Sequence, residues 1–477
     1  MRQTQSEKKI FAITVNNTVS IECIDNYVDS FSNYFRTYRF NNTPTARYYV
    51  QGLLLCNKGQ ANMERMEEEV EGSEYRAYQH FITNSNWDTE GLRTALSKEA
   101  SKVLSKQKQL TGRPTGYIVD ESGHLKKGKQ SVGVARQYAG VAGKVDNCQV
   151  GVYCSLVNGC DATIINERIF LPENWTTDPV RCKAAGIPTE YQKFKTKPQL
   201  VLDMIKQDIE NGVEFDWIGG DGLYGHSYEL CKGIDQLGKL FVLDVHKDET
   251  VYLQEPVISV PERKSKKGKT PFKLTADKAA VRLDALLDGI LTNEWIRVNV
   301  RDSTSGILQR DVYKRQVWVW DKEESQARKR TLIITKTVAD KPEIKYSLSN
   351  GDVNQYTHKE YAYFVCQRYW VERTFDDAKN EIGLSDYQIR KWRSWHNHHA
   401  MVMLTALFIM KQKIENREQT PLLSFRDTRI LIILHLFGTN EQIEKRLEQM
   451  AKRHDKRNLS ILFNYKKQAE YKELLTL

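Results

Sequence analysis

The chain has 477 residues, too many for one ordinary core, and its length predicts about three domains. A hydrophobic content of 40% predicts a folded protein, and the absence of a long apolar run excludes a typical membrane-spanning segment. The formal net charge of +10 favours a polyanionic partner such as nucleic acid. The eight cysteines form no C-x-x-C pair, so neither a zinc ribbon nor a disulfide framework is indicated.

Residues 1–110 predict a helical N-terminal domain, because short apolar segments alternate there with charged helical ones. The triplet Asn86-Trp87-Asp88 interrupts this pattern, and Asp88 is expected to be the N-cap of a second helix. In a basic protein such a domain is expected either to dock on DNA or only to pack on its neighbour.

Short strands predominate after a polar linker. Strands are predicted at 117–120, 148–157 and 161–171, followed by an amphipathic helix that ends near residue 212. A fourth strand begins at 215 and a fifth spans 239–245, with a helix between them, which implies a parallel crossover. Asp120 and Asp221 each follow one of these strands, at the edge where ligands bind in α/β sheets.

Residues 246–360 predict a mainly β insertion. Three runs carry the strand pattern, and the first two alternate with period two: 295–302, 311–321 and 330–338.

A charged helix follows the insertion. Arg368, Glu372 and Lys379 fall within about 40° of one another on a helical projection, beside an apolar stripe. The stripe consists of Val371, Phe375, Ala378 and Ile382. Taken alone, Arg368 and Glu372 are a common surface ion pair. The alternative is that the helix presents Glu372 over a cleft.

Asp120, Asp221 and Glu372, taken in chain order, indicate a ribonuclease-H-like layout with one acid after each of two strands and one on a helix. Oxygen-only ligands favour a hard cation such as Mg²⁺ or Mn²⁺. Two such ions, about 4 Å apart, can activate an attacking oxygen and stabilise a leaving one at phosphorus.

Three blocks resemble DDE transposases of bacterial insertion sequences, of the IS-four-like and IS-seven-hundred-and-one-like kind. They are YIVDESGHLKKGKQSVGVARQYAGVAGKVDNCQVGVY (117–153), WIGGDGLYG (217–225) and RYWVERTFDDAKNEIGLSDYQIRKW (368–392). The resemblance implies an α/β fold with a ribonuclease-H-like catalytic core, a mixed five-stranded sheet with flanking helices, interrupted by the β insertion. The expected domains are a helical DNA-binding domain (1–110), the catalytic domain (111–245 and 361–415), the insertion (246–360) and a helical C-terminal region (416–477).

The same resemblance implies Asp120, Asp221 and Glu372 as catalytic residues and ligands of two Mg²⁺ or Mn²⁺ ions. In the IS-four-like group the glutamate belongs to a Tyr, Arg, Glu, Lys signature, to which Arg368, Glu372 and Lys379 correspond, whereas Val365 stands at the tyrosine position. Glu121 is the main rival to Asp120, because neighbouring residues of a strand point to opposite faces.

Further DNA contacts are expected from basic and aromatic residues. Arg368 and Lys379 would hold phosphates beside the metal ions. The other candidates are Lys126, Lys127, Lys129, Arg136, Trp318, Trp320, Arg390 and Trp392. For the tryptophans the alternative is a role in the core, and His124 is expected to be a surface-loop histidine rather than a ligand.

The expected function is cut-and-paste transposition: cleavage at transposon inverted ends, then joining of the 3′-hydroxyl ends to target DNA. The expected partner is double-stranded DNA, bound by a homodimer on paired ends, with no membrane and no small-molecule substrate involved. The expected location is cytoplasmic and nucleoid-associated. The rival hypotheses are a domesticated DNA-binding protein and a stand-alone nuclease of the same fold.

Overall fold

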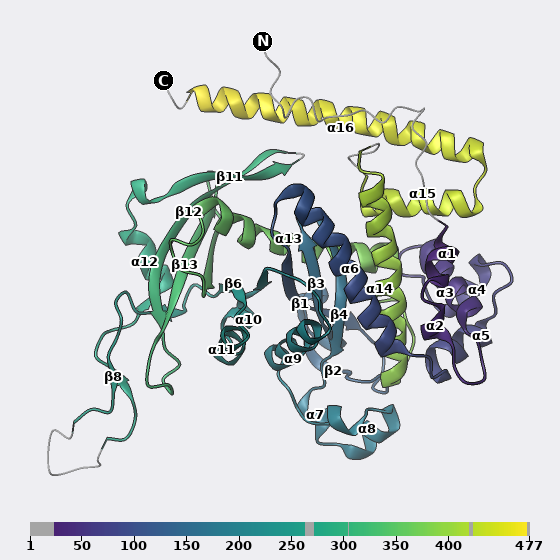
Figure 1. Ribbon diagram of the computed structural model, residues 1–477, viewed down its shortest axis with the longest axis horizontal. Helices are drawn as coiled ribbons and strands as arrows, with labels where there is room; N and C mark the ends of the chain where they lie inside the picture. Colours follow the sequence, from purple (N-terminus) through teal and green to yellow (C-terminus); the bar gives the residue numbers. More distant parts are fainter. Residues whose placement is uncertain (1–22, 263–270, 304, 419–422, 475–477) are drawn as a thin grey trace. The chain divides into compact units, whose positions relative to one another are not determined.

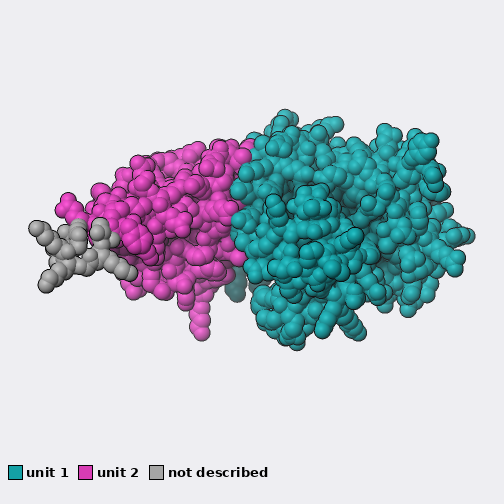
Figure 2. All heavy atoms as spheres, turned by 90° about the horizontal axis from the view of Figure 1, so that it is seen from below, with its two compact units in different colours: residues 1–115, 120–215, 369–477 teal, residues 116–119, 216–368 magenta. Residues whose placement is uncertain are grey.

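The computed structural model describes residues 23–262, 271–303, 305–418 and 423–474. Parts of the predicted N-terminal domain, insertion and C-terminal region therefore lie outside the described residues. The chain forms two compact units (Figure 2). Unit 1 comprises Met1–Thr115, Asp120–Phe215 and Tyr369–Leu477, and unit 2 comprises Gly116–Val119 and Asp216–Arg368. The domain boundaries expected from the sequence stay a prediction.

Two elements run from one unit into the other. Strand β1 (Gly116–Leu125) has its first four residues in unit 2 and the rest in unit 1. Helix α13 (His358–Glu381) begins in unit 2 and continues in unit 1 from Tyr369 onward.

The first part of unit 1 is helical, as predicted. Its helices are α1 (Ile24–Asp29), α2 (Ser32–Phe35), α3 (Thr43–Leu55), α4 (Met63–Glu69), α5 (Tyr75–Gln79) and α6 (Thr89–Thr111). The break before α6 is confirmed, because the Asp88 carboxylate accepts a hydrogen bond from the Gly91 N–H at 2.8 Å. Gly112 ends α6 in the left-handed conformation that favours glycine, with φ of 67°.

The sheet of unit 1 is built around the long strand β3 (Lys144–Asn158), which neighbours β1. Strand β3 pairs antiparallel with β2 (Ala135–Ala139) and with β4 (Asp161–Ile169). Helices α6 and α14 (Trp392–Glu415) lie alongside each other and pack on β4 (Figure 1). The connection to unit 2 contains α7 (Glu173–Thr176), α8 (Pro179–Ala185) and α9 (Lys197–Glu210).

Two further helices, α15 (Phe425–Phe437) and α16 (Asn440–Leu474), end the described chain. Leu431 of α15 packs in one apolar cluster with Leu447 and Met450 of α16, and the Arg453 guanidinium lies 2.8 Å from the Asp427 carboxylate. Within the described ranges, no helix combines the length and the apolar content needed to cross a bilayer.

Unit 2 contains one long mixed sheet with the strand order β11-β12-β13-β14-β6-β5-β1. The pairs β1–β5 and β5–β6 are parallel, and the remaining pairs are antiparallel. The bounds are β5 (Trp217–Gly220), β6 (Leu240–Val245), β11 (Ile296–Ser303), β12 (Gly306–Val319), β13 (Arg328–Thr337) and β14 (Ile344–Ser349). The parallel crossover between β5 and β6 contains α10 (Gly222–Gly225) and α11 (Tyr228–Gln236).

The insertion continues this sheet. Strands β11, β12 and β13 occupy the three predicted runs, whereas β14 was not predicted and joins the insertion to β6. Smaller elements of the insertion are β7 (Thr250–Val251), β8 (Ile258–Ser259), β9 (Thr275–Ala276), β10 (Val281–Arg282) and α12 (Leu283–Leu286). The order β4-β3-β1 in unit 1 and β1-β5-β6 in unit 2 is ribonuclease-H-like, so the predicted fold class is confirmed.

Candidate active site

Asp120 lies in the middle of β1 and is the first residue of this strand that belongs to unit 1. Its Oδ1 accepts a hydrogen bond from the Glu121 N–H at 2.8 Å. The side chain of Glu121 instead accepts a hydrogen bond from Lys197 Nζ of α9 at 2.8 Å. The two rivals therefore have different surroundings, and Glu121 has a cationic partner within the protein.

Asp221 directly follows β5 and caps the short helix α10, because its Oδ1 accepts a hydrogen bond from the Leu223 N–H at 2.9 Å. The glycines after it allow α10 to lie close against the end of β6 and the residue that follows. A Cβ on Gly222 would stand 2.9 Å from the His246 ring, and one on Gly225 would stand 1.9 Å from the Asp244 carbonyl oxygen. The glycine-rich turn is thus required by close packing around Asp221.

Asp244, on β6, is an acid that the sequence interpretation missed. Its Oδ1 accepts a hydrogen bond from Ser347 Oγ of β14 at 2.7 Å, and Arg368 Nε lies 3.6 Å from its Oδ2. Burial raises the pKa of Asp244, the Arg368 charge opposes this rise, and the negative charge of Asp221 adds to it. Asp221, Asp244 and Arg368 are therefore electrostatic neighbours in unit 2. The signal for Asp244 was available, since it stands near the end of a predicted strand.

The apolar stripe predicted for α13 is confirmed, because Val371, Phe375 and Ala378 are buried while Glu372 is exposed. Val365, at the position of the family's tyrosine, is buried in the same helix and is only 8% exposed. A tyrosine at this place would need room that a valine does not.

Lys379, on the unit 1 part of α13, lies within electrostatic range of Asp120. Burial lowers the pKa of Lys379, while the negative charges of Asp376 and Asp120 oppose the shift. Unit 1 thus brings a predicted phosphate-binding cation near a predicted metal ligand, and in unit 2 Arg368 pairs with Asp244, which also interacts electrostatically with Asp221.

The chemistry of the donor set fits a hard divalent cation, since Asp120, Asp221 and Glu372 offer only carboxylate oxygens. The negative charge of Asp221 raises the pKa of Asp244, an effect that a bound cation would oppose. In the part of the chain that the structure describes, no group of three or more His, Cys, Asp or Glu side chains is arranged to hold a metal ion.

The predicted DNA contacts have varied surroundings. Lys127, Lys129, Arg136 and Arg390 are exposed. Lys126 is largely buried, donates a hydrogen bond to the Tyr387 carbonyl at 2.9 Å and lies 3.6 Å from the centre of the Tyr387 ring. Burial lowers its pKa to about 8. Lys126 therefore has partners within the protein, and its role as a phosphate contact stays a prediction.

The three candidate tryptophans are all packed to some degree. Trp392 is only 8% exposed, and its ring lies 5.0 Å from that of Tyr191. Trp320 donates a hydrogen bond from Nε1 to the Glu324 carbonyl at 2.7 Å, and Trp318 forms a backbone bridge with Tyr252. These contacts give the rings of Trp320 and Trp392 a structural role, and the use of all three tryptophans in DNA binding stays a prediction.

The expectation that His124 lies in a surface loop is wrong. His124 belongs to β1 and is only 1% exposed. Its Nε2 lies 2.7 Å from the Tyr153 hydroxyl, and its Nδ1 lies 2.9 Å from Ser385 Oγ. Strand β1 extends further than the short apolar run that was used to predict it. The buried ring nitrogens of His124 find hydrogen-bond partners on β3 and on the segment after α13.

Comparisons with known proteins find a similar sequence and a similar solved structure. The chain is 32% identical over 178 residues to the probable transposase for insertion sequence element IS701 of Microchaete diplosiphon. This match covers 36% of the chain and 41% of the relative. A solved piggyBac transposase synaptic complex with hairpin DNA is similar with a TM-score of 0.39 and 11% identity, over 93% of this chain and 84% of that one.

The family described as DDE superfamily endonuclease matches residues 30–307, a range that includes Asp120 and Asp221 and ends before Glu372. Because this range is more than half of the chain, the protein belongs to the DDE superfamily endonucleases, and the resemblance inferred from its motifs is confirmed.

Proposed function

We propose that this protein is a metal-dependent DNA transposase that cleaves the inverted ends of its own element and joins the 3′-hydroxyl ends to target DNA. The proposed metal ligands are Asp120, Asp221 and Glu372, and the proposed cofactor is a pair of Mg²⁺ or Mn²⁺ ions. Membership of an endonuclease family and the excess of basic residues support DNA as the substrate.

The observation that carries the proposal is the register of the parallel strands in unit 2. Ile118 of β1 pairs with Gly219 of β5, and each strand reaches an acid, Asp120 or Asp221, two residues further on. The carboxyl ends of adjacent parallel strands share one edge of a sheet, which supports a common role for the two acids. The position of Asp244 two residues after Val242, which pairs with Gly219, extends the same row.

Each group in the proposed site has a distinct task. A bound pair of divalent cations would supply activation of the attacking oxygen and stabilisation of the leaving oxygen at phosphorus. Asp120, Asp221 and Glu372 would hold these cations, and Arg368 and Lys379 would bind the phosphates next to the scissile bond. The ion pair of Arg368 with Asp244 would orient the guanidinium before DNA binds.

Excision from a supercoiled plasmid that carries the element between its inverted repeats tests this function. With Mg²⁺ and purified protein, we expect release of the element and its insertion into a second plasmid through its 3′ ends. A protein that only nicks DNA at arbitrary positions would instead be a stand-alone nuclease, and one that binds the ends without cutting would be a DNA-binding protein. If the protein acts as a dimer on paired ends, we expect cleavage at one inverted end to require the presence of the other end.

A further inference from the structure

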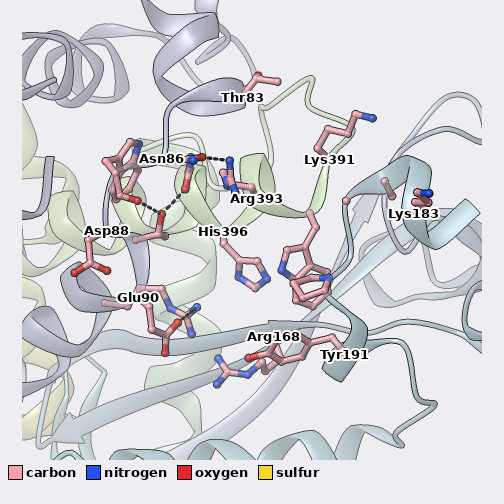
Figure 3. A pocket seen from close by; sticks show the side chains of 18 of the residues that line it. Thr83, Asn86, Asp88, Glu90, Arg168, Lys183, Tyr191, Lys391, Arg393 and His396 are labelled. Carbon is pink, nitrogen blue, oxygen red and sulfur yellow. Dashed lines mark hydrogen bonds and ion pairs between the residues drawn. The ribbon is translucent and has the colours of Figure 1, made fainter. Parts of the chain in front are cut away.

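A cavity of about 900 Å³ opens in unit 1 among α6, β4, α8 and the first turns of α14 (Figure 3). None of the carboxylates of the proposed metal site lines it. The residues that matter for its chemistry are Arg168, Lys183, Tyr191, Lys391, Arg393 and His396. Figure 3 shows Asp88 and Glu90 on one side of the cavity and Lys183 and Lys391 on the other.

The cations on the α8 and α14 side are available to a ligand. Lys183, Lys391 and Arg393 are exposed, and no acidic side chain among the described residues pairs with any of them. Lys391 Nζ donates to the Ala184 carbonyl and Arg393 to the Asn86 side chain, contacts that leave both positive charges uncompensated.

The two acids on the far side are engaged within the protein. The Asp88 carboxylate caps α6, and the Glu90 carboxylate lies 3.2 Å from Arg93 Nη1 and accepts a hydrogen bond from Gln207 at 2.7 Å. Glu90 is therefore compensated by Arg93, whereas the cations of the rim have no acidic partner, and this excess of positive charge favours an anion.

The wall between the cations adds a polar and an aromatic surface. Tyr191 is 39% exposed and lies on Trp392, so one face of a ring is open to a ligand. His396 is only 7% exposed, its Nδ1 lies 2.9 Å from Glu167 Oε1, and its Nε2 has no hydrogen-bond partner within the described residues. Helix α14 begins here without a side-chain cap at Lys391, which places the positive end of a 24-residue helix at the cavity.

Two of the DNA contacts predicted from the sequence lie on segments that are hydrogen-bonded to α8 or lie just before α14. Arg181 of α8 donates a hydrogen bond to the Lys129 carbonyl at 3.0 Å, and the Val132 N–H donates one to the Arg390 carbonyl at 3.0 Å. Exposed Lys129 and Arg390 therefore stand on segments that are tied to α8 and to the start of α14.

We propose that this cavity binds backbone phosphates of duplex DNA, with Lys183, Lys391 and Arg393 as the phosphate contacts and Tyr191 against a deoxyribose. The proposal rests on the proposed function only in taking DNA as the partner, and it adds α8 to the DNA-binding surface. Such contacts carry no base specificity, so they would strengthen binding to any duplex and fix its path across unit 1.

The test is a salt titration of DNA binding without catalysis. Fluorescence anisotropy in EDTA would measure the Kd of a fluorescein-labelled duplex of arbitrary sequence for the wild-type protein and the double variant Lys183→Gln/Arg393→Gln. The matched control is Lys102→Gln/Lys106→Gln, which removes the same charge from exposed positions of α6. Thermal unfolding of each variant verifies that it is folded.

Loss of two phosphate contacts is expected to weaken binding by roughly 60-fold at 0.1 M salt and to lower the slope of log Kd against log salt by about 1.8. The control is expected to change the Kd less than about threefold and to keep the wild-type slope. A double variant whose Kd and slope match those of the control would overturn the proposal while leaving the proposed function intact. A wild-type protein that does not bind the arbitrary duplex would overturn this proposal, and one that also fails to bind a duplex bearing the inverted end would overturn both.

Discussion

Neutralising Glu167 is expected to destabilise unit 1 strongly. This glutamate of β4 is fully buried, with Oε1 3.2 Å from Arg93 Nε and 2.9 Å from His396 Nδ1. Glu167→Gln keeps the shape of the side chain but leaves Arg93, whose side chain is 7% exposed, without its buried counter-charge. Breaking one partner of a buried pair costs about 3–5 kcal/mol, and we expect the lower end because Glu90 still faces Arg93.

Urea unfolding of both proteins at pH 7 measures this cost directly. The matched control is Glu90→Gln, which removes the 56% exposed partner of the same arginine and should cost less than about 1 kcal/mol. Burial acts to raise the pKa of Glu167, but Arg93 and His396 outweigh it and the pKa is lowered. The ionised carboxylate therefore contributes stability above the unfolded pKa, and this contribution is lost as the pH falls through the folded pKa. A Glu167→Gln protein as stable as the control at pH 7 would refute the reasoning.

Three further predictions each concern a single residue. The folded pKa of the Lys126 amine lies near 8, so the free energy of unfolding of the wild type should rise by up to about 3 kcal/mol between pH 8 and 10.5. In Lys126→Met this rise should be absent and the protein should be more stable at pH 7, both measured by urea unfolding. Gly225→Ala should lower the free energy of unfolding by at least about 2 kcal/mol, since its Cβ would meet the Asp244 carbonyl oxygen, whereas Gly140→Ala, with open space around it, should be nearly neutral. Asp244→Asn should slow DNA cleavage about tenfold by releasing Arg368, with an unchanged rate contradicting the positioning role.

The elements that the sequence predicted well are those with a strong local pattern. The amphipathic stripe of α13, the N-cap at Asp88 and the strand before Asp221 each depend on neighbouring residues only, and all three are confirmed. Strand β14 was missed although Ile344–Ser349 alternates apolar and polar residues. Its partner β6 is distant in the chain, so the local pattern alone did not place it in the sheet.

Residues whose surroundings depend on tertiary contacts were harder to interpret. His124 resembled a loop histidine because glycine precedes it and lysines follow it, but Tyr153 and Ser385 bury it from two other elements. Asp244 was overlooked although it lies near the end of an apolar strand, because its significance comes from Arg368 and Asp221, which are distant in the sequence. Lys126 was grouped with exposed lysines, and only the Tyr387 contact distinguishes it.

The central claim is that Asp120, Asp221 and Glu372 act together through divalent cations. Single-turnover cleavage of a labelled duplex bearing the element's inverted end, with Mg²⁺, tests it in Asp120→Asn, Asp221→Asn and Glu372→Gln, with Glu121→Gln as the matched control. Each of the three variants should lose about 10³-fold or more in rate while binding the duplex in EDTA as the wild type does, and Glu121→Gln should stay within about tenfold of wild type. Cleavage by Asp221→Asn or Glu372→Gln at the wild-type rate, or loss of activity in Glu121→Gln with Asp120→Asn active, would contradict this assignment.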